Sequence, residues 1–156
     1  MKRLLMTLLA ACFATVVTTS VAQQPEPPKP QVPTVLKGGQ VVDAKAVKLL
    51  IDAKGASFFD MRSPMNYNKG HLPGAKSLPY RENSEFKEDF DAGKDQFDLK
   101  ALPADKAAKI VFYSDGPTGW KSYKAAVLAI KGGYTNVDYF RGGTAEWLKA
   151  GYAMQK

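Results

Sequence analysis

The sequence is nearly devoid of thiol and imidazole groups: it contains one cysteine, Cys12, and one histidine, His71. A disulfide needs two cysteines and a thiolate metal site needs several, so both are excluded. We expect no metal and no other cofactor. Blocks of like charge are also missing, because Lys, Asp and Glu alternate along a chain of formal net charge +7. This pattern predicts no nucleic-acid partner, and a mildly basic surface favours encounters with anions.

Long apolar runs are scarce as well, and the only one covers residues 4–17 behind a basic start. It is shorter than the roughly 20 residues of a membrane-spanning helix, and a small-residue cleavage site, Ser20-Val21-Ala22, follows it. We therefore expect a signal peptide over residues 1–22, cleavage after Ala22, a periplasmic or secreted protein, and no transmembrane segment in the mature chain. A lipoprotein signal ending at Cys12 is the less favoured alternative, since the apolar run continues past it.

With the signal peptide removed, no cysteine remains in the mature chain. Residues 23–33 contain five of the ten prolines and few apolar residues. This composition favours extended polyproline conformation, so we expect a linker there. Residues 34–156 have the size of one domain, and no internal repeat is visible.

Helix-type and strand-type patterns alternate along this domain. Helices are expected at Asp43–Lys54, Trp120–Lys131 and Thr144–Ala150. Strands are expected at Ser57–Met61, Ala75–Leu78, Lys109–Tyr113 and Asn136–Phe140. Polar-faced helical turns are expected at Ser84–Asp91 and Asp105–Ala108. The alternation predicts an α/β fold with a central parallel sheet and helices on both faces. Ligands of such sheets bind beyond the carboxyl ends of the strands, which directs attention to the loop after Tyr113.

Three separated segments resemble the rhodanese family. They are the Asp-x-Arg motif with its Gly-His-Leu-Pro-Gly-Ala continuation (residues 60–75), the strand-loop-helix of residues 110–122, and the Gly-Gly…Trp ending (residues 140–147). Their order and spacing match the family across most of the domain, so the resemblance implies a rhodanese-like fold. It also implies structural roles for Asp60, Arg62, His71, Gly74, Gly142, Gly143 and Trp147.

In the family, the residue directly after the tyrosine of the second segment's strand is a cysteine that accepts sulfur as a persulfide. Here that position is Ser114. A long-loop variant of the family reads Tyr-Cys-x-Gly-Pro-x-Cys-x-x-Ser, and this chain has Ser114 and Gly119 in place of its two cysteines. The chain matches that variant at Tyr113, Gly116, Pro117 and Ser122.

A serine at this position does not form a stable persulfide, and as a nucleophile it needs an adjacent base that a third group orients. The resemblance places His71, the only histidine, in a structural turn remote from the loop. We therefore expect no catalytic residue, and a Ser114–His71 hydrolase is disfavoured.

The loss of the thiol leaves a loop whose backbone N–H groups and following helix start suit an oxyanion. The expected anion-binding loop comprises Ser114, Asp115, Gly116, Pro117, Thr118, Gly119, Trp120, Lys121 and Ser122. The competing interpretation is a plain strand-to-helix connection in which the glycines and the proline only form turns. The sequence leaves these two interpretations open.

Other conspicuous residues have structural interpretations. Asp60 and Arg62 are expected to form an ion pair that fixes the chain after its strand. The alternating charges between Glu82 and Lys94 are expected to form a solvated face. Core and rim positions are expected for the aromatic residues Trp120, Tyr123, Phe140, Trp147 and Tyr152.

Three hypotheses of different classes follow. The favoured one is a non-catalytic rhodanese-like module that binds a small oxyanion or a protein partner in the cell envelope. The second is a sulfurtransferase of the family that acts by an unusual route, although fold alone does not establish that activity. The third is an accessory domain without a ligand.

Overall fold

The structure is a computed structural model, and it describes residues 28–156. The expected signal peptide, its cleavage site after Ala22 and the alternative acylation site at Cys12 lie outside the described residues. No helix within residues 28–156 is long and apolar enough to cross a membrane.

Five parallel strands form one sheet in the order β1-β5-β4-β2-β3. The strands are β1 (Gln40–Val42), β2 (Ser57–Asp60), β3 (Lys76–Ser77), β4 (Ile110–Tyr113) and β5 (Val137–Phe140). The helices are α1 (Ala44–Asp52), α2 (Pro64–Lys69), α3 (Trp120–Lys131) and α4 (Gly143–Lys149), with 3-10 turns η1 (Ala92–Lys94) and η2 (Leu99–Ala101). The central strand β4 is an unbroken apolar run that is buried throughout, as expected for a parallel strand covered on both faces.

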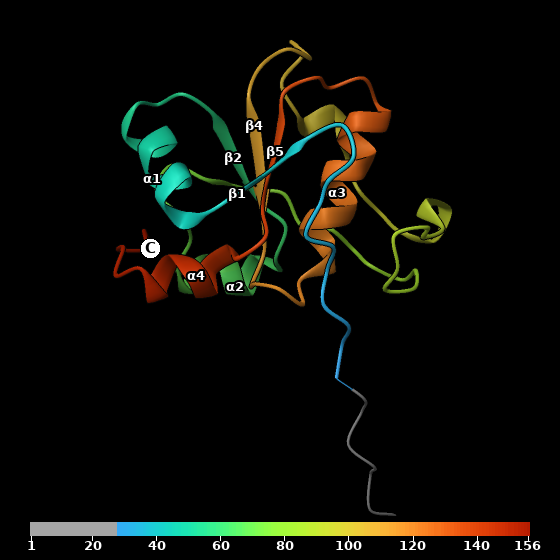
Figure 1. The fold of residues 1–156 in the computed structure, drawn as a ribbon, viewed down its shortest axis with the longest axis horizontal. Helices are drawn as coiled ribbons and strands as arrows, with labels where there is room; N and C mark the ends of the chain where they lie inside the picture. The colour runs from blue at the N-terminus through green and yellow to red at the C-terminus, as the bar shows by residue number, and fades with distance from the viewer. Residues whose placement is uncertain (1–27) are drawn as a thin grey trace, which may run out of the picture.

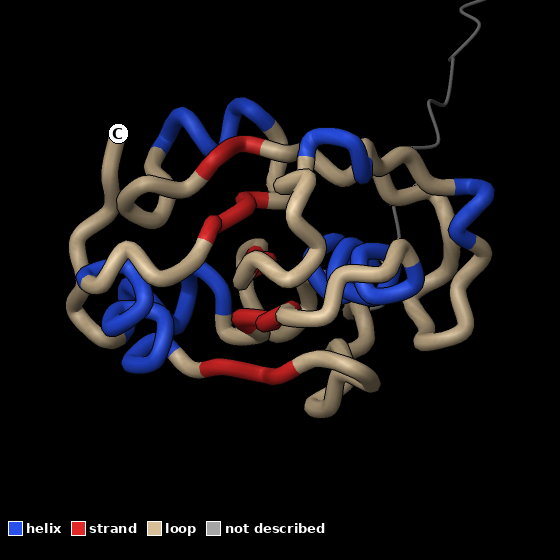
Figure 2. Tube along the Cα trace, turned by 90° about the horizontal axis from the view of Figure 1, so that it is seen from above, coloured by secondary structure: helices blue, strands red, loops and turns tan. Residues whose placement is uncertain are grey.

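Helices cover both faces of the sheet, which confirms the predicted architecture (Figures 1 and 2). On one face, α3 packs over a core that includes Phe59, Phe112 and Tyr139. On the other, α1 and α4 pack over a core that includes Phe58 and Val111. Neighbouring strand residues thus supply opposite cores, because successive side chains of a strand point to opposite faces.

The predicted helices lie where periodicity and capping place them. Asp43 caps α1 by accepting a hydrogen bond from the Ala46 amide at 2.8 Å. The α3 bounds agree with the prediction, and the glycine pair after Lys131 ends the helix, with Gly133 at φ +92°. The sequence missed β1 and α2, and β3 is shorter than the apolar run that predicted it.

The prediction of helical turns over Ser84–Asp91 is wrong. That segment is a series of bends without helix. The Asp95 carboxylate accepts hydrogen bonds from the Asn83 and Ser84 amides, both at 2.7 Å, and from the Ser84 hydroxyl at 2.6 Å. A carboxylate distant in sequence therefore holds the start of this segment in a bent conformation.

The expected solvated face between Glu82 and Lys94 is also wrong at its first residue. Glu82 is mostly buried, and its Oε1 lies 3.1 Å from Nζ of Lys124, a lysine of α3 with no exposed surface. Lys124 also donates to the Ser84 hydroxyl at 2.8 Å and lies 3.7 Å from Asp95. A buried lysine needs such partners, so this network fastens the segment after β3 onto α3.

The proline-rich segment makes more contacts than a linker would. Residues 29–36, here called the strap, lie against the domain beside α3 (Figure 1). Val32 and Leu36 are 2% and 3% exposed and belong to the core beneath α3. The Trp120 indole donates to the Pro30 carbonyl oxygen at 2.8 Å. The sequence predicts a linker through residue 33. In the structure, carbonyl oxygens of residues 29–33 accept hydrogen bonds from side chains of the domain, as an extended segment without internal hydrogen bonds allows.

Candidate functional site

The loop after β4 lies at the carboxyl edge of the sheet and leads directly into α3. Within it, Ser114 and Gly116 are buried, whereas Asp115, Pro117 and Thr118 are exposed. Beyond it, Trp120 and Ser122 are buried in the first turn of α3, and Lys121 is half-buried. The structure thus brings the predicted anion-binding residues together in one turn between a strand and a helix.

The Ser114 hydroxyl is already engaged in hydrogen bonds. It donates to the Gly119 carbonyl oxygen at 3.0 Å and lies 2.9 Å from the Ser122 hydroxyl, which reaches the same carbonyl at 3.2 Å. Ser114 is 2% exposed. The hydroxyl therefore closes the loop onto the start of α3 and does not stand free as a nucleophile.

The loop carbonyls nearest the strand are held by α4. The Thr144 amide donates to the Ser114 oxygen and the Ala145 amide to the Asp115 oxygen, each at 3.0 Å. This contact requires Gly143, since it has φ +53° and a Cβ there would overlap the Ser114 carbonyl. The Gly-Gly motif therefore lets the first turn of α4 approach the loop backbone closely.

Three of the four remaining loop carbonyls also have donors, whereas the Thr118 oxygen accepts no hydrogen bond within residues 28–156. Gly119 donates its amide to the Gly116 oxygen at 2.8 Å, and Val32 of the strap donates to the Pro117 oxygen at 2.8 Å. In contrast, the amides of Asp115, Gly116 and Thr118 donate to no acceptor among residues 28–156. A loop with most of its carbonyls neutralised and three N–H groups unused presents positive partial charge, as in anion-binding nests.

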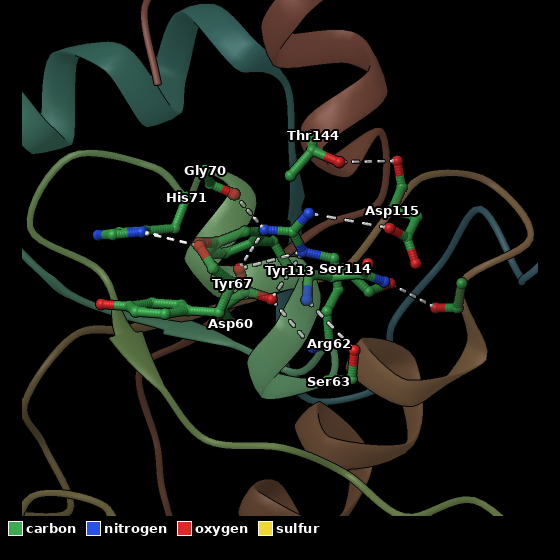
Figure 3. A network of polar contacts seen from close by, with 12 residues as sticks. Asp60, Arg62, Ser63, Tyr67, Gly70, His71, Tyr113, Ser114, Asp115 and Thr144 are labelled. Atoms are coloured by element: carbon green, nitrogen blue, oxygen red, sulfur yellow. Dashed lines mark hydrogen bonds and ion pairs between the residues drawn. The ribbon is translucent and has the colours of Figure 1, made fainter. Parts of the chain in front are cut away.

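Asp60 and Arg62 form the expected ion pair behind the loop (Figure 3). The Arg62 Nη2 lies 2.6 Å from the Asp60 carboxylate and donates to the Gly70 carbonyl at 2.7 Å. Burial would lower the pKa of Arg62, but the hydrogen bond and charge of Asp60 outweigh it and raise that pKa. Arg62 also lies 3.9 Å from the exposed carboxylate of Asp115, a weak contact because water screens it.

The contacts of His71 are those of a residue that supports the fold. Its ring stacks on Tyr67 with centroids 3.8 Å apart, and its Nδ1 lies 3.1 Å from the Tyr67 carbonyl oxygen. Its backbone pairs with Gln155 in an isolated bridge. No hydrogen bond joins it to Ser114 in the described chain, so these two residues do not form a nucleophile–base pair.

The other motif residues also support the fold. Gly74 turns the chain with φ +74° after the His71 bridge. The Trp147 indole donates to the Ala153 carbonyl at 3.0 Å and so holds the chain end against α4. A Cβ on Gly142 would overlap the Glu146 side chain, whose Oε1 accepts from the Ala44 amide at 2.9 Å. No group of three or more His, Cys, Asp or Glu residues suited to a metal occurs within residues 28–156.

Two buried tyrosines lie below the loop, and sequence reasoning singled out only the first, Tyr113. Tyr113 accepts a hydrogen bond from the Leu72 amide at 3.2 Å, and the Tyr139 hydroxyl lies next to Ser122 without a well-formed hydrogen bond in the described chain. Burial raises the pKa of both. Tyr139 occupies an ordinary core position of a strand, so the sequence offered no signal that would single it out.

Comparisons with known proteins agree with the fold. The family model described as "Rhodanese-like domain" matches residues 43–150. The chain is 31% identical over 113 residues to a tRNA uridine(34) hydroxylase of Erwinia tasmaniensis, a match that covers 71% of this chain and 29% of that protein. A Yersinia enterocolitica protein of the same name is 30% identical over 111 residues, covering 71% and 29%. The chain thus spans less than a third of these relatives.

Solved structures show the same fold at low identity. A Bacillus halodurans protein superposes with a TM-score of 0.56 and 23% identity, covering 74% of this chain and 76% of that one. A thiosulfate sulfurtransferase of Pseudomonas aeruginosa gives a TM-score of 0.57 with 22% identity, covering 76% and 20%.

Proposed function

The chain belongs to the family of rhodanese-like domains, and on that basis we propose that it is an exported, non-catalytic member that binds a small oxyanion at the loop of residues 114–119. The oxyanion is either free or carried by a protein partner of the cell envelope. The proposal rests on a difference between the backbone carbonyl groups and the backbone amide groups of the loop. All of its carbonyls except that of Thr118 are bonded within the protein, and the amides of Asp115, Gly116 and Thr118 are not.

The residue after β4 supports the non-catalytic part of the proposal. Ser114 has no thiolate to attack sulfane sulfur. Its hydroxyl is bonded to Gly119 and Ser122, and the only histidine of the chain is stacked on Tyr67. A sulfurtransferase acting by an unusual route would need a sulfur acceptor that the mature chain, beginning after Ala22, does not contain.

The charges near the loop decide how tightly an anion binds. The guanidinium of Arg62 is committed to Asp60, and the exposed carboxylate of Asp115 opposes an approaching anion. The unused amides, the start of α3 and the half-buried Lys121 near it favour weak rather than tight binding, because Arg62 is not available to the anion. The expected ligands are sulfate, phosphate and thiosulfate.

A melting experiment tests this proposal directly. Each oxyanion should raise the melting temperature above that in chloride at equal ionic strength, and a ligand at about 100 times its Kd would stabilise the fold by about 2.7 kcal/mol. Thr118→Pro, which deletes one free amide, should weaken the shift. Thr118→Val, which keeps that amide and removes only the hydroxyl, should retain it. Equal melting temperatures in all salts would leave the loop as a plain connection.

Export is tested separately by sequencing the N-terminus of the protein recovered from cells. The proposal expects a mature chain that starts at Gln23, directly after Ala22. An acylated N-terminus at Cys12 would make the protein a lipoprotein.

The relatives' activity on tRNA uridine 34 is not part of this proposal. It belongs to proteins of which this chain covers 29% or less. The mixed charge of the chain offers no basic block for a nucleic acid.

A further inference from the structure

A second hollow lies beyond Pro117, outside the loop of unused amides. It has a volume of about 600 Å³ and opens between the strap, the carboxyl ends of β1 and β5, and α4. Its apolar wall is formed by Val41, Val42, Pro117 and Ala145. The volume falls within the range of small-molecule sites, and the position at the strand ends is where open α/β sheets bind ligands.

Two cations line this hollow without a carboxylate partner. The half-buried Arg141 donates from Nε to the Val32 carbonyl at 3.2 Å and from Nη2 to the Gln31 side-chain oxygen at 3.0 Å, both neutral acceptors. Lys149 is exposed at the end of α4. Within residues 28–156, neither cation forms an ion pair. Arg141 therefore keeps donors for a further acceptor.

The two carboxylates that also line the hollow already serve the start of α1. Asp43 caps the Ala46 amide at 2.8 Å, and Glu146 reaches across from α4 to the Ala44 amide at 2.9 Å. Carboxylates at a helix N-terminus are stabilised by its unpaired amides and its dipole. The acidic groups are thus held by the protein itself, whereas the basic groups remain open to a ligand.

From this arrangement we infer that the hollow binds a small organic anion with an apolar body. The acidic head lies against Arg141 and Lys149, and the body lies on Val41, Pro117 and Ala145. The inference goes beyond the proposed function, because this site excludes the amide cradle and shares only Pro117 with that loop.

Two probes with the same rings separate the charge from the apolar contact. 8-Anilinonaphthalene-1-sulfonate carries a sulfonate, and N-phenyl-1-naphthylamine is its uncharged counterpart. In fluorescence titrations of the full mature chain, the anion should bind about tenfold more tightly, the effect of one charge-assisted hydrogen bond. Lys149→Gln and Arg141→Gln should each reduce this preference and leave the affinity for the neutral probe unchanged.

A substitution that fills the hollow locates the probe. Ala145→Phe should abolish binding of both probes, and Ala150→Phe, at the exposed residue that directly follows α4 outside the hollow, should not. Equal affinity for the two probes, or binding that survives Ala145→Phe, would overturn the inference. Because Lys149 forms no ion pair within residues 28–156, its variant keeps the test valid even if Arg141→Gln loosens the strap.

Discussion

The hydroxyl oxygen of Ser114 occupies the space in which residue 119 would carry a Cβ atom. A Cβ on Gly119 would overlap Ser114 Oγ, and that same oxygen donates to the Gly119 carbonyl at 3.0 Å. These are the two positions at which the long-loop family variant has cysteines. In this chain the two residues are therefore coupled: the serine fills the turn, and the glycine leaves room for it.

Gly119→Ala should consequently destabilise the fold by about 1–3 kcal/mol, the usual cost of overpacking a closed site. Urea unfolding measures the change. Gly55→Ala is the matched control, because its Cβ would meet only ordinary contacts, the nearest at 3.6 Å. This control should remain within about 0.5 kcal/mol of the wild type.

The coupling itself is measured by adding Ser114→Ala to the Gly119→Ala chain. Removing Oγ takes away the worst overlap, so the double variant should be more stable than the sum of the single changes by about 0.5–3 kcal/mol. Strictly additive effects would show that the loop avoids the overlap by another movement.

Ser114→Cys should restore a sulfur acceptor at a small cost in stability. Thiosulfate should add one sulfur atom to this variant and none to the wild type, as mass spectrometry would show. The unused amides around the loop should also hold the thiol pKa below the ordinary value of about 8.5. We expect a loss of about 1 kcal/mol, because a thiol is a weaker donor to Gly119 than the hydroxyl.

Ser77→Cys is the control for this experiment, since it places a thiol on an exposed strand away from the loop. Its thiol should titrate near the ordinary value and gain no sulfur. Sulfur transfer to cyanide by the cysteine-free wild type would refute the non-catalytic proposal.

The sequence predicted the sheet and the site loop because both depend on local patterns. The apolar run of β4, the periodicity of α3 and the glycines before Trp120 are each legible within a short window. The ion pair of Asp60 and Arg62 was also predictable, since only one residue separates them.

The errors occurred where a distant residue decides the local structure. Ser84 follows a helical pattern, but the Asp95 carboxylate takes its amide and hydroxyl. The polar residue Glu82 is buried because Lys124 of α3 pairs with it. The strap gave no apolar pattern, yet Val32 is buried through contacts with residues more than 80 positions away. Such long-range pairings leave no periodic signal in one sequence.

Arg62→Met should destabilise the fold by about 3–5 kcal/mol. The substitution leaves the carboxylate of Asp60, which has no exposed surface, without its partner, and an uncompensated buried charge is costly. Chemical denaturation measures the loss. Arg81→Met is the control, because Arg81 is exposed and forms no ion pair in the described chain. Similar losses for the two variants would mean that the Asp60–Arg62 pair contributes nothing specific.

The Asp95 carboxylate should make the stability depend on acid pH. Burial alone would raise its pKa, but the hydroxyls of Ser84 and Tyr80 and two backbone amides hold it at about 2. A lowered pKa in the folded state stabilises the protein fully above the unfolded value of about 3.9. This contribution, about 2 kcal/mol, is lost as the pH falls toward 2.

Asp95→Asn isolates that carboxylate from the other acids. The stability difference between wild type and variant, measured by urea unfolding, should be largest at pH 6 and shrink by about 2 kcal/mol on approach to pH 2. A difference that stays constant over this range would show that Asp95 is not held in its charged form.

The strap should behave as part of the domain, and two valines within it provide the test. Val32 is 2% exposed and donates its amide to the Pro117 carbonyl, whereas Val35 is 71% exposed. Val32→Ala should therefore cost about 1–2 kcal/mol of stability, since two buried methyl groups are lost. Val35→Ala should remain within about 0.5 kcal/mol of the wild type.

Hydrogen exchange at the Val32 amide gives an independent measure of the same contact. The bond to Pro117 should protect that amide in the wild type, and Trp120→Phe, which removes the indole donor to Pro30, should weaken the protection. The valine substitutions and the exchange data must agree. Equal stability of the two alanine variants together with an unprotected Val32 amide would restore the interpretation of residues 23–33 as a free linker. It would also remove the strap as one wall of the hollow beside Arg141.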